Sequence, residues 1–309
     1  MFKLPNVNPT YRASAQDWAD YAEYHALLYG RVNFYDLSKS SRMISDEETV
    51  NGTEDDADRY LEKVDEIAAE IRTRIGSGEE LYPFVLEDHD YSLLFKEKSE
   101  RSRIIYSYLL LATRANMMSD RRKAGIDGAL LFEHLCAVVA QNYFGHRAEA
   151  KVFGTSKEDI GNFRTRLREI TLLLKEGGDI HENPGHKPQD EKVDVIVWKS
   201  FKDRQPSQMI GFAQCKTGTN WVHRLSELDT QAFCNTWFTR QPVITPVRLF
   251  FTAQCFPRET FRVRANEAGL VFDRFRILDY LPEEIEEKLI TSMRDWSNAI
   301  IGFYSKCEG

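Results

Sequence analysis

The chain has 309 residues, of which 42% are hydrophobic and 29% charged, and its net charge is −7. This composition is typical of a globular protein with one large domain or two modest ones. No run of about 18 apolar residues exists, which argues against a transmembrane helix. The first six residues lack the apolar segment of a secretory signal. Five scattered cysteines without a CxxC pair argue against a zinc site and a disulfide framework. We therefore expect a cytoplasmic protein with no membrane partner.

The charge is unevenly distributed along the chain. Residues 1–100 carry 11 Lys and Arg against 22 Asp and Glu, a balance of −11. The remaining residues carry 30 basic against 26 acidic side chains, a balance of +4. An acidic front and a mildly basic remainder indicate two parts with different partners, although both can equally be solvated surfaces.

The sequence of residues 1–124 predicts a mostly helical structure. An aromatic-rich segment opens at Ser14 and continues to Tyr35, and a polar loop follows from 38 to 53. Apolar residues then recur at helical spacing from Asp55 to Ile75, a run that ends at Gly76. Another helix is predicted over 96–118. We expect residues 1–124 to form a helical, acidic domain that serves a partner, self-association or regulation, and that folds apart from the rest without contacting DNA.

After Gly125 helices and strands alternate. Helices are predicted over 127–143, 157–176, 225–240, 258–268 and 282–303. Strands are predicted over 148–153, 192–198, 208–216, 247–254 and 270–277. This alternation predicts an α/β domain over 125–309, with a central mixed sheet flanked by helices.

Polar residues interrupt two neighbouring apolar strands. Asp194 stands among valines in Val193-Asp194-Val195-Ile196-Val197, and a buried carboxylate there needs a cation or several donors. A strand-end aspartate facing water is the alternative. Gln214 and Lys216 are two residues apart and point the same way. A short polar connection joins the two strands, so a hairpin would bring Asp194 close to both.

A third polar residue stands in an apolar helix. Glu133 lies in a run from Ala129 to Ala140 that is apolar on nearly all sides, which indicates burial. Its partner is either an arginine or a metal ion shared with Asp194.

The combination resembles the PD-(D/E)XK nuclease superfamily, and the Mrr-type restriction endonucleases most closely. The resemblance rests on Gly128-x4-Glu133, on Val193-Asp194-Val195-Ile196-Val197 and on Ala213-Gln214-Cys215-Lys216, and it covers about residues 125–280. It implies a restriction-endonuclease-like sheet in which Glu133, Asp194 and Gln214 bind Mg²⁺, for which Mn²⁺ substitutes. Lys216 then assists the attacking water. Gln214 stands where most members have a carboxylate, but its oxygen also suits a hard cation.

The same resemblance implies DNA as substrate, an endonuclease in prokaryotic antiviral defence, and a homo-oligomer with a companion ATPase or sensor. Arginines for phosphate contact would come from two helices, with solvated faces as the alternative. They are Arg164, Arg168, Arg258 and Arg262. Two rival interpretations stay open: an inactive nuclease-fold module that binds nucleic acid or a protein, and an RNase that uses the same site.

Overall fold

The computed structural model describes residues 3–4, 9–10, 13–40, 54–87, 89, 91–96, 99–153, 163–182 and 192–305. The chain divides into two compact units. The first comprises Met1–Gly128 and Ile290–Gly309, and the second comprises Ala129–Leu289. The predicted boundary after residue 124 falls close to the first crossing, but the first unit also takes residues from the other end of the chain.

Helices make up most of the first unit. They are α1 (Ala15–Tyr29), α2 (Phe34–Ser40), α3 (Glu54–Gly78), α4 (Glu100–Arg114) and the larger part of α10 (Glu287–Tyr304), with a short 3-10 turn at Glu79–Leu81. The hydroxyl oxygen of Ser14 accepts the Asp17 amide at 3.2 Å and so caps α1, which ends at Gly30 in a left-handed conformation. The loop predicted over 38–53 lies largely outside the described residues.

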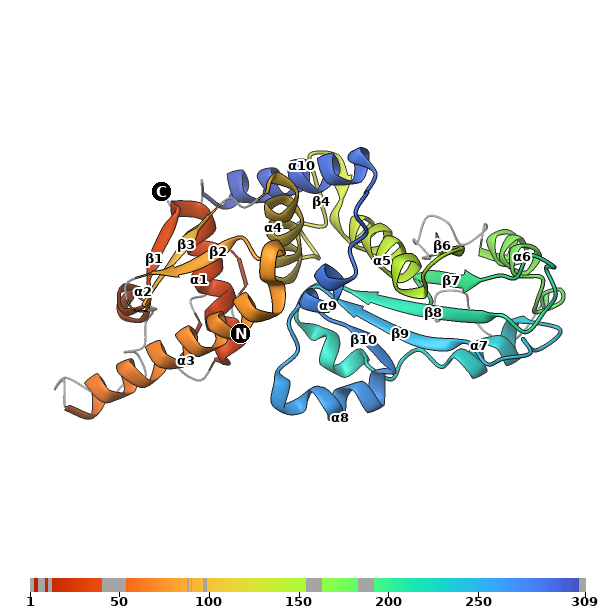
Figure 1. Cartoon of the computed structure of the whole chain (residues 1–309), viewed down its shortest axis with the longest axis horizontal. Coiled ribbons are helices and arrows are strands. Elements are labelled where there is room, and N and C mark those ends of the chain that lie inside the picture. The colour runs from red at the N-terminus through yellow and green to blue at the C-terminus, as the bar shows by residue number, and fades with distance from the viewer. Residues whose placement is uncertain are drawn as a thin grey trace. The chain divides into compact units, whose positions relative to one another are not determined.

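The first unit is mostly helical, as predicted, but it also contains a small sheet. Its strands β1 (Arg31–Asn33), β3 (Ser92–Phe95) and β2 (Phe84–Glu87) form an antiparallel sheet in that order (Figure 1). Each strand has only three or four residues. The strand β1 pairs with β3, which is about 60 residues away in the sequence, and Arg31 lies opposite Leu94. Such strands are too short for an alternating pattern to reveal them. A two-stranded hairpin of β4 (Arg122–Lys123) and β5 (Ile126–Asp127) completes this unit's β-structure.

Within the first unit, α10 packs against residues 120–128. A Cβ atom added to Gly128 would lie 2.4 Å from the indole of Trp296, which explains why a glycine is the first residue of α5 (Gly128–Phe144). The Trp296 ring N–H donates to the Arg121 carbonyl at 3.2 Å, and the Tyr304 hydroxyl donates to Asp120. The residues after Ile290 are therefore an integral part of this unit's packing.

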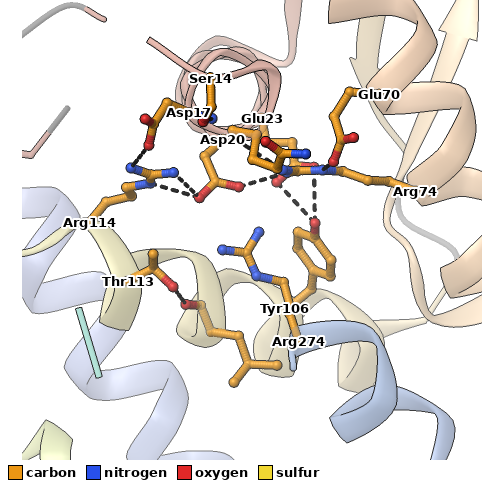
Figure 2. A network of polar contacts seen from close by, with 12 residues as sticks. Ser14, Asp17, Asp20, Glu23, Glu70, Arg74, Tyr106, Thr113, Arg114 and Arg274 are labelled. Atoms are coloured by element: carbon orange, nitrogen blue, oxygen red, sulfur yellow. Dashed lines mark hydrogen bonds and ion pairs between the residues drawn. The ribbon is translucent and has the colours of Figure 1, made fainter. Parts of the chain in front are cut away.

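A buried ionic network joins three helices of the first unit (Figure 2). The Arg74 Nη1 atom on α3 lies 2.6 Å from Asp20 Oδ1 and 2.7 Å from Glu23 Oε1, both on α1. Arg114 on α4 reaches Asp20 Oδ2 from its Nε atom at 2.7 Å. The Tyr106 hydroxyl donates to Glu23 at 2.9 Å. Part of the acidic surplus of the first 100 residues is thus internal and paired, rather than displayed to a partner.

Replacing Arg74 with methionine is expected to lower the free energy of unfolding by about 3–5 kcal/mol, because it leaves buried carboxylates without their cation. Urea unfolding followed by circular dichroism measures the loss. Arg72 lies on the same helix and is exposed, so Arg72→Met serves as the control and should change stability by about 0.5 kcal/mol or less. Equal losses in the two variants would show that the network contributes nothing.

The second unit is built on one mixed five-stranded sheet. Its strands are β6 (Ala148–Val152), β7 (Val195–Lys199), β8 (Met209–Lys216), β9 (Val247–Thr252) and β10 (Leu270–Phe272), in the order β10-β9-β8-β7-β6 (Figure 1). Neighbours β6, β7 and β8 run antiparallel, whereas β8, β9 and β10 run parallel. The predicted α/β class with a central mixed sheet is confirmed.

Helices pack on both faces of this sheet. The helix α5 (Gly128–Phe144) lies on one face, where a Cβ atom added to Gly211 would meet the Phe144 ring at 2.8 Å. The helices α6 (Phe163–Leu174) and α7 (Thr230–Trp237) enclose a core against the other face with Ile196, Trp198 and Phe212. A second cluster of buried hydrophobic side chains, on β9 and β10, packs against α8 (Arg258–Ala268).

Several predicted elements of the second unit differ in extent. The helix predicted over 282–303 begins only at Glu287, and two further differences have a clear cause. The strand predicted over 270–277 ends at Phe272, because Asp273 accepts the Arg276 amide at 3.1 Å and starts the short helix α9 (Arg274–Asp279). The helix predicted over 225–240 begins only at Thr230, where Asp229 accepts the Ala232 amide at 2.9 Å. Both starts follow an aspartate N-cap.

Candidate active site

Asp194 lies immediately before β7, at the end of the sheet where β8 finishes. Its amide donates to the Ala213 carbonyl at 2.8 Å, and its carbonyl accepts the Phe153 amide at 2.7 Å, so the backbone is tied to both neighbouring strands. Its carboxylate oxygen Oδ2 accepts the backbone N–H of Cys215 at 2.7 Å. The residue as a whole is partly exposed, but its carboxylate is desolvated. Asp194 is therefore held in place by its backbone contacts and by the Cys215 amide.

Gln214 is fully buried beside this carboxylate, as the antiparallel register of β7 and β8 requires. Its Nε2 atom donates to Glu227 Oε2 at 2.8 Å. Its Oε1 atom is buried and accepts no hydrogen bond from any described residue. A buried acceptor without a donor costs about 1–3 kcal/mol. That cost is removed if a cation or a donating ligand occupies the site.

Lys216 ends β8 two residues later, so it points to the same face of the sheet as Gln214. Its side chain is partly exposed, and it forms no hydrogen bond or ion pair with the part of the chain that the structure describes. Its positive charge nevertheless acts on Asp194 and on Glu227. A cation in this position can reach a bound anion without first breaking an internal ion pair.

Glu133 reaches the same region from α5 and is partly exposed, not enclosed as the sequence predicts. Cys136 follows it by one helical turn, and the Cys136 thiol interacts with that of Cys215 on β8. The carboxylates of Glu133 and Asp194 both act electrostatically on this pair of thiols. The structure thus brings Asp194, Gln214 and Lys216 to one end of the sheet, and it places Glu133 on α5, the helix that packs on the Cys215 face of β8.

The electrostatics distinguish the two carboxylates next to Gln214. Burial raises the pKa of Asp194, and the nearby charge of Glu227 raises it further, whereas Lys216 and the Cys215 amide oppose the rise. Burial also favours a higher pKa for Glu227, but hydrogen bonds from Arg224 and Gln214 outweigh it and lower that pKa. Burial raises the pKa of the Cys215 thiol well above its usual value. Cys215 therefore stays protonated and serves packing.

Glu227 is a site residue that the sequence analysis misses. It lies in the loop between the 3-10 helix η4 (Asn220–Arg224) and α7, where it binds Arg224 as well as Gln214. The prediction of one continuous helix over 225–240 concealed this position. The sequence Asp229-Thr230-Gln231 carries the relevant signal, because an aspartate N-cap there leaves Glu227 outside the helix.

The four predicted phosphate-binding arginines differ in their surroundings. Arg164 lies in the first turn of α6 and is partly exposed, and Arg258 and Arg262 lie on the exposed surface of α8. Arg168 already pairs with Glu182, and its Nε atom lies 3.8 Å from Asp179. The structure therefore leaves Arg168 less available to a phosphate than the sequence suggests.

No set of three or more His, Cys, Asp and Glu side chains in the described ranges is grouped so as to hold a metal ion without other ligands. The donors near the sheet end are instead one carboxylate, Asp194, and one amide oxygen, Gln214 Oε1, with Glu133 nearby. Oxygen donors of this kind suit a hard cation such as Mg²⁺, which keeps several waters. The orphaned oxygen of Gln214 is the feature that fits such an ion.

Across the described helices, none combines the length and apolar content needed to cross a bilayer. A scan against protein-family models, a search of curated proteins and a search of solved structures each gave no significant match to this chain.

Proposed function

We propose that the second unit is a Mg²⁺-dependent nuclease that hydrolyses phosphodiester bonds in DNA. The observation that carries the proposal is the fully buried Gln214, whose Oε1 atom accepts no hydrogen bond from the described residues beside a fixed carboxylate and an unpaired lysine. This arrangement offers a cation two oxygens and offers a phosphate one ammonium group. The restriction-endonuclease-like resemblance supports the same assignment.

Each residue has a distinct part in the proposed reaction. Asp194 and Gln214 would hold Mg²⁺, with Glu133 as the further carboxylate, and the bound ion would supply positive charge for the scissile phosphate. Lys216 would donate hydrogen bonds to the attacking water or to a phosphate oxygen, and its charge would stabilise the negative charge that develops there. Glu227 would keep the amide of Gln214 oriented with its oxygen toward the ion, because a carboxylate accepts only from the N–H₂ end.

Cleavage of a plasmid by the purified full chain is the direct test. We expect supercoiled DNA to be nicked or linearised with Mg²⁺ or Mn²⁺ and to remain intact with EDTA. Linear duplex, single-stranded DNA and RNA in parallel reactions identify the substrate. Cleavage of RNA alone would assign the same site to an RNase. No cleavage of any of the four substrates with either metal would contradict a nuclease.

A further inference from the structure

A cavity of about 580 Å³ opens at the opposite end of the second unit's sheet. Its walls come from the turn before β6, the end of α6, and the connection between β7 and β8, and they include Gln208. Gln208 and Gln214 are six residues apart along one extended segment, about 20 Å. The cavity is therefore separate from the candidate active site, and its size suits a small ligand.

Positive charge dominates the rim of this cavity. Four basic side chains line it and one acidic side chain, Glu149, opposes them. The basic residues are Arg147, Lys175, Lys202 and Arg204. All four are exposed, and none forms an ion pair or a side-chain hydrogen bond with the residues that the structure describes. Such a rim attracts an anion of more than one negative charge.

The cavity wall also contains a buried acceptor without a donor. Gln208 is 2% exposed, and its Nε2 atom donates to the Leu174 carbonyl, which fixes the direction of the amide. Its Oε1 atom is buried and accepts no hydrogen bond from the described residues. The amide of Gln208 therefore has a fixed orientation in the wall of the cavity.

Hydrogen bonds to the Glu176 carboxylate hold the backbone around Gln208 in place. The Glu176 carboxylate is buried and accepts the amides of Ser207 at 3.0 Å and Gln208 at 3.2 Å through one oxygen. Its other oxygen accepts the Val243 amide at 2.7 Å. Two of these three backbone donors belong to the connection between β7 and β8, and the third lies in the loop before β9, so the carboxylate ties the backbone at Gln208 to that loop.

Apolar side chains also line the cavity, and one of them is an aromatic ring. Phe201 is 59% exposed, and Leu172 and Leu173 on α6 are also exposed beside it. Exposed aromatic rings next to basic residues are the usual platform for nucleic acid bases, whose planar faces stack on them. The cavity thus combines an aromatic platform, a buried acceptor and a cationic rim.

We propose that this cavity binds a nucleotide. The phosphates lie on the basic rim, and the base stacks against Phe201. A free nucleotide and a nucleotide unit of a single strand share this chemistry, so the test includes both. The proposal concerns a second site and does not depend on hydrolysis at Asp194.

Isothermal titration of the full chain in EDTA tests the proposal without cleavage. The ligands are the diphosphates of adenosine, guanosine, cytidine and uridine, inorganic pyrophosphate, and single-stranded pentadeoxynucleotides without terminal phosphate. We expect at least one nucleoside diphosphate or pentanucleotide to bind at least tenfold more tightly than pyrophosphate. A tighter pentanucleotide would identify a single strand as the ligand, and a tighter diphosphate a free nucleotide. No ligand binding more tightly than pyrophosphate would overturn the proposal.

Two surface variants locate the binding. Phe201→Ala should weaken the nucleotide by about tenfold and leave pyrophosphate unchanged, because only the base stacks. Lys202→Glu should weaken both. Lys288→Glu, an exposed lysine elsewhere in the second unit, is the matched control and should bind like the original protein. Unchanged nucleotide affinity in both Phe201→Ala and Lys202→Glu would overturn the assignment to this cavity, while the nuclease proposal would still stand.

Discussion

The Lys216→Ala variant is expected to lose DNA cleavage by on the order of 10³-fold or more, while its fold and its affinity for DNA stay close to those of the original protein. Lys216 has no ion pair or hydrogen bond with the described residues, so its removal breaks no internal contact among them. Its charge acts on Asp194, at the point where a phosphate would bind. The rate of plasmid nicking, measured with DNA binding at low salt in EDTA, separates catalysis from affinity.

Lys151→Ala is the matched control for this experiment. Lys151 stands on β6 of the same sheet and pairs at 3.0 Å with Glu169, an exposed contact that contributes little to stability. We expect this variant to cleave at the original rate. Turnover at the original rate in Lys216→Ala would remove Lys216 from the proposed reaction.

The second large effect is expected at the metal. Loss of a residue that only hydrogen-bonds a metal ligand typically reduces metal affinity by roughly 10–100-fold. Asp194→Asn should reduce Mg²⁺ affinity by more than this, because it removes the negative charge of a proposed direct ligand. The Cys215 amide can still donate to the side-chain oxygen of the substituted asparagine, so the local backbone contact is preserved. Calorimetric titration with Mg²⁺ in the absence of DNA measures the change. An unchanged affinity would place the metal elsewhere.

Gln214 gives a further test of the same metal site. A glutamate there adds a carboxylate to the ligand set, but it also replaces the N–H₂ group that donates to Glu227 at 2.8 Å. Two carboxylates would then face each other, so Gln214→Glu alone should tighten Mg²⁺ binding less than Gln214→Glu combined with Glu227→Gln. Equal affinities in the single and double variants would show that Glu227 does not orient residue 214.

The arrangement of Asp194, Gln214 and Lys216 could be predicted because it follows from local rules. The twofold alternation of a strand places Gln214 and Lys216 on one face, and a short connection pairs the two strands. The helix over 258–268 could also be predicted from the sequence, and the structure contains it with the same bounds. In each instance the controlling contacts lie within one element or between consecutive elements.

The features that escaped prediction depend on contacts distant in sequence or on where an element starts. β1 is three residues long and exists because it pairs with β3, about 60 residues away. Glu227 joins the site only because α7 begins at Thr230 and leaves a loop under Gln214. The cavity at Gln208 combines three connections that no pattern in the sequence links. Such arrangements require the folded backbone before their residues can be identified.

The composition of the first unit has a consequence for the order of events during synthesis. Residues up to Gly128 leave the ribosome before the second unit, but the segment from Ile290 that packs with them is made only after that unit. The hydrogen bond of Asp120 with Tyr304 and the packing of Trp296 on Gly128 can form only after α10 has been synthesised. The unit that is begun first is therefore the last to be completed. The sheet that carries Asp194 and Lys216 can form while the N-terminal residues still lack their closing helix.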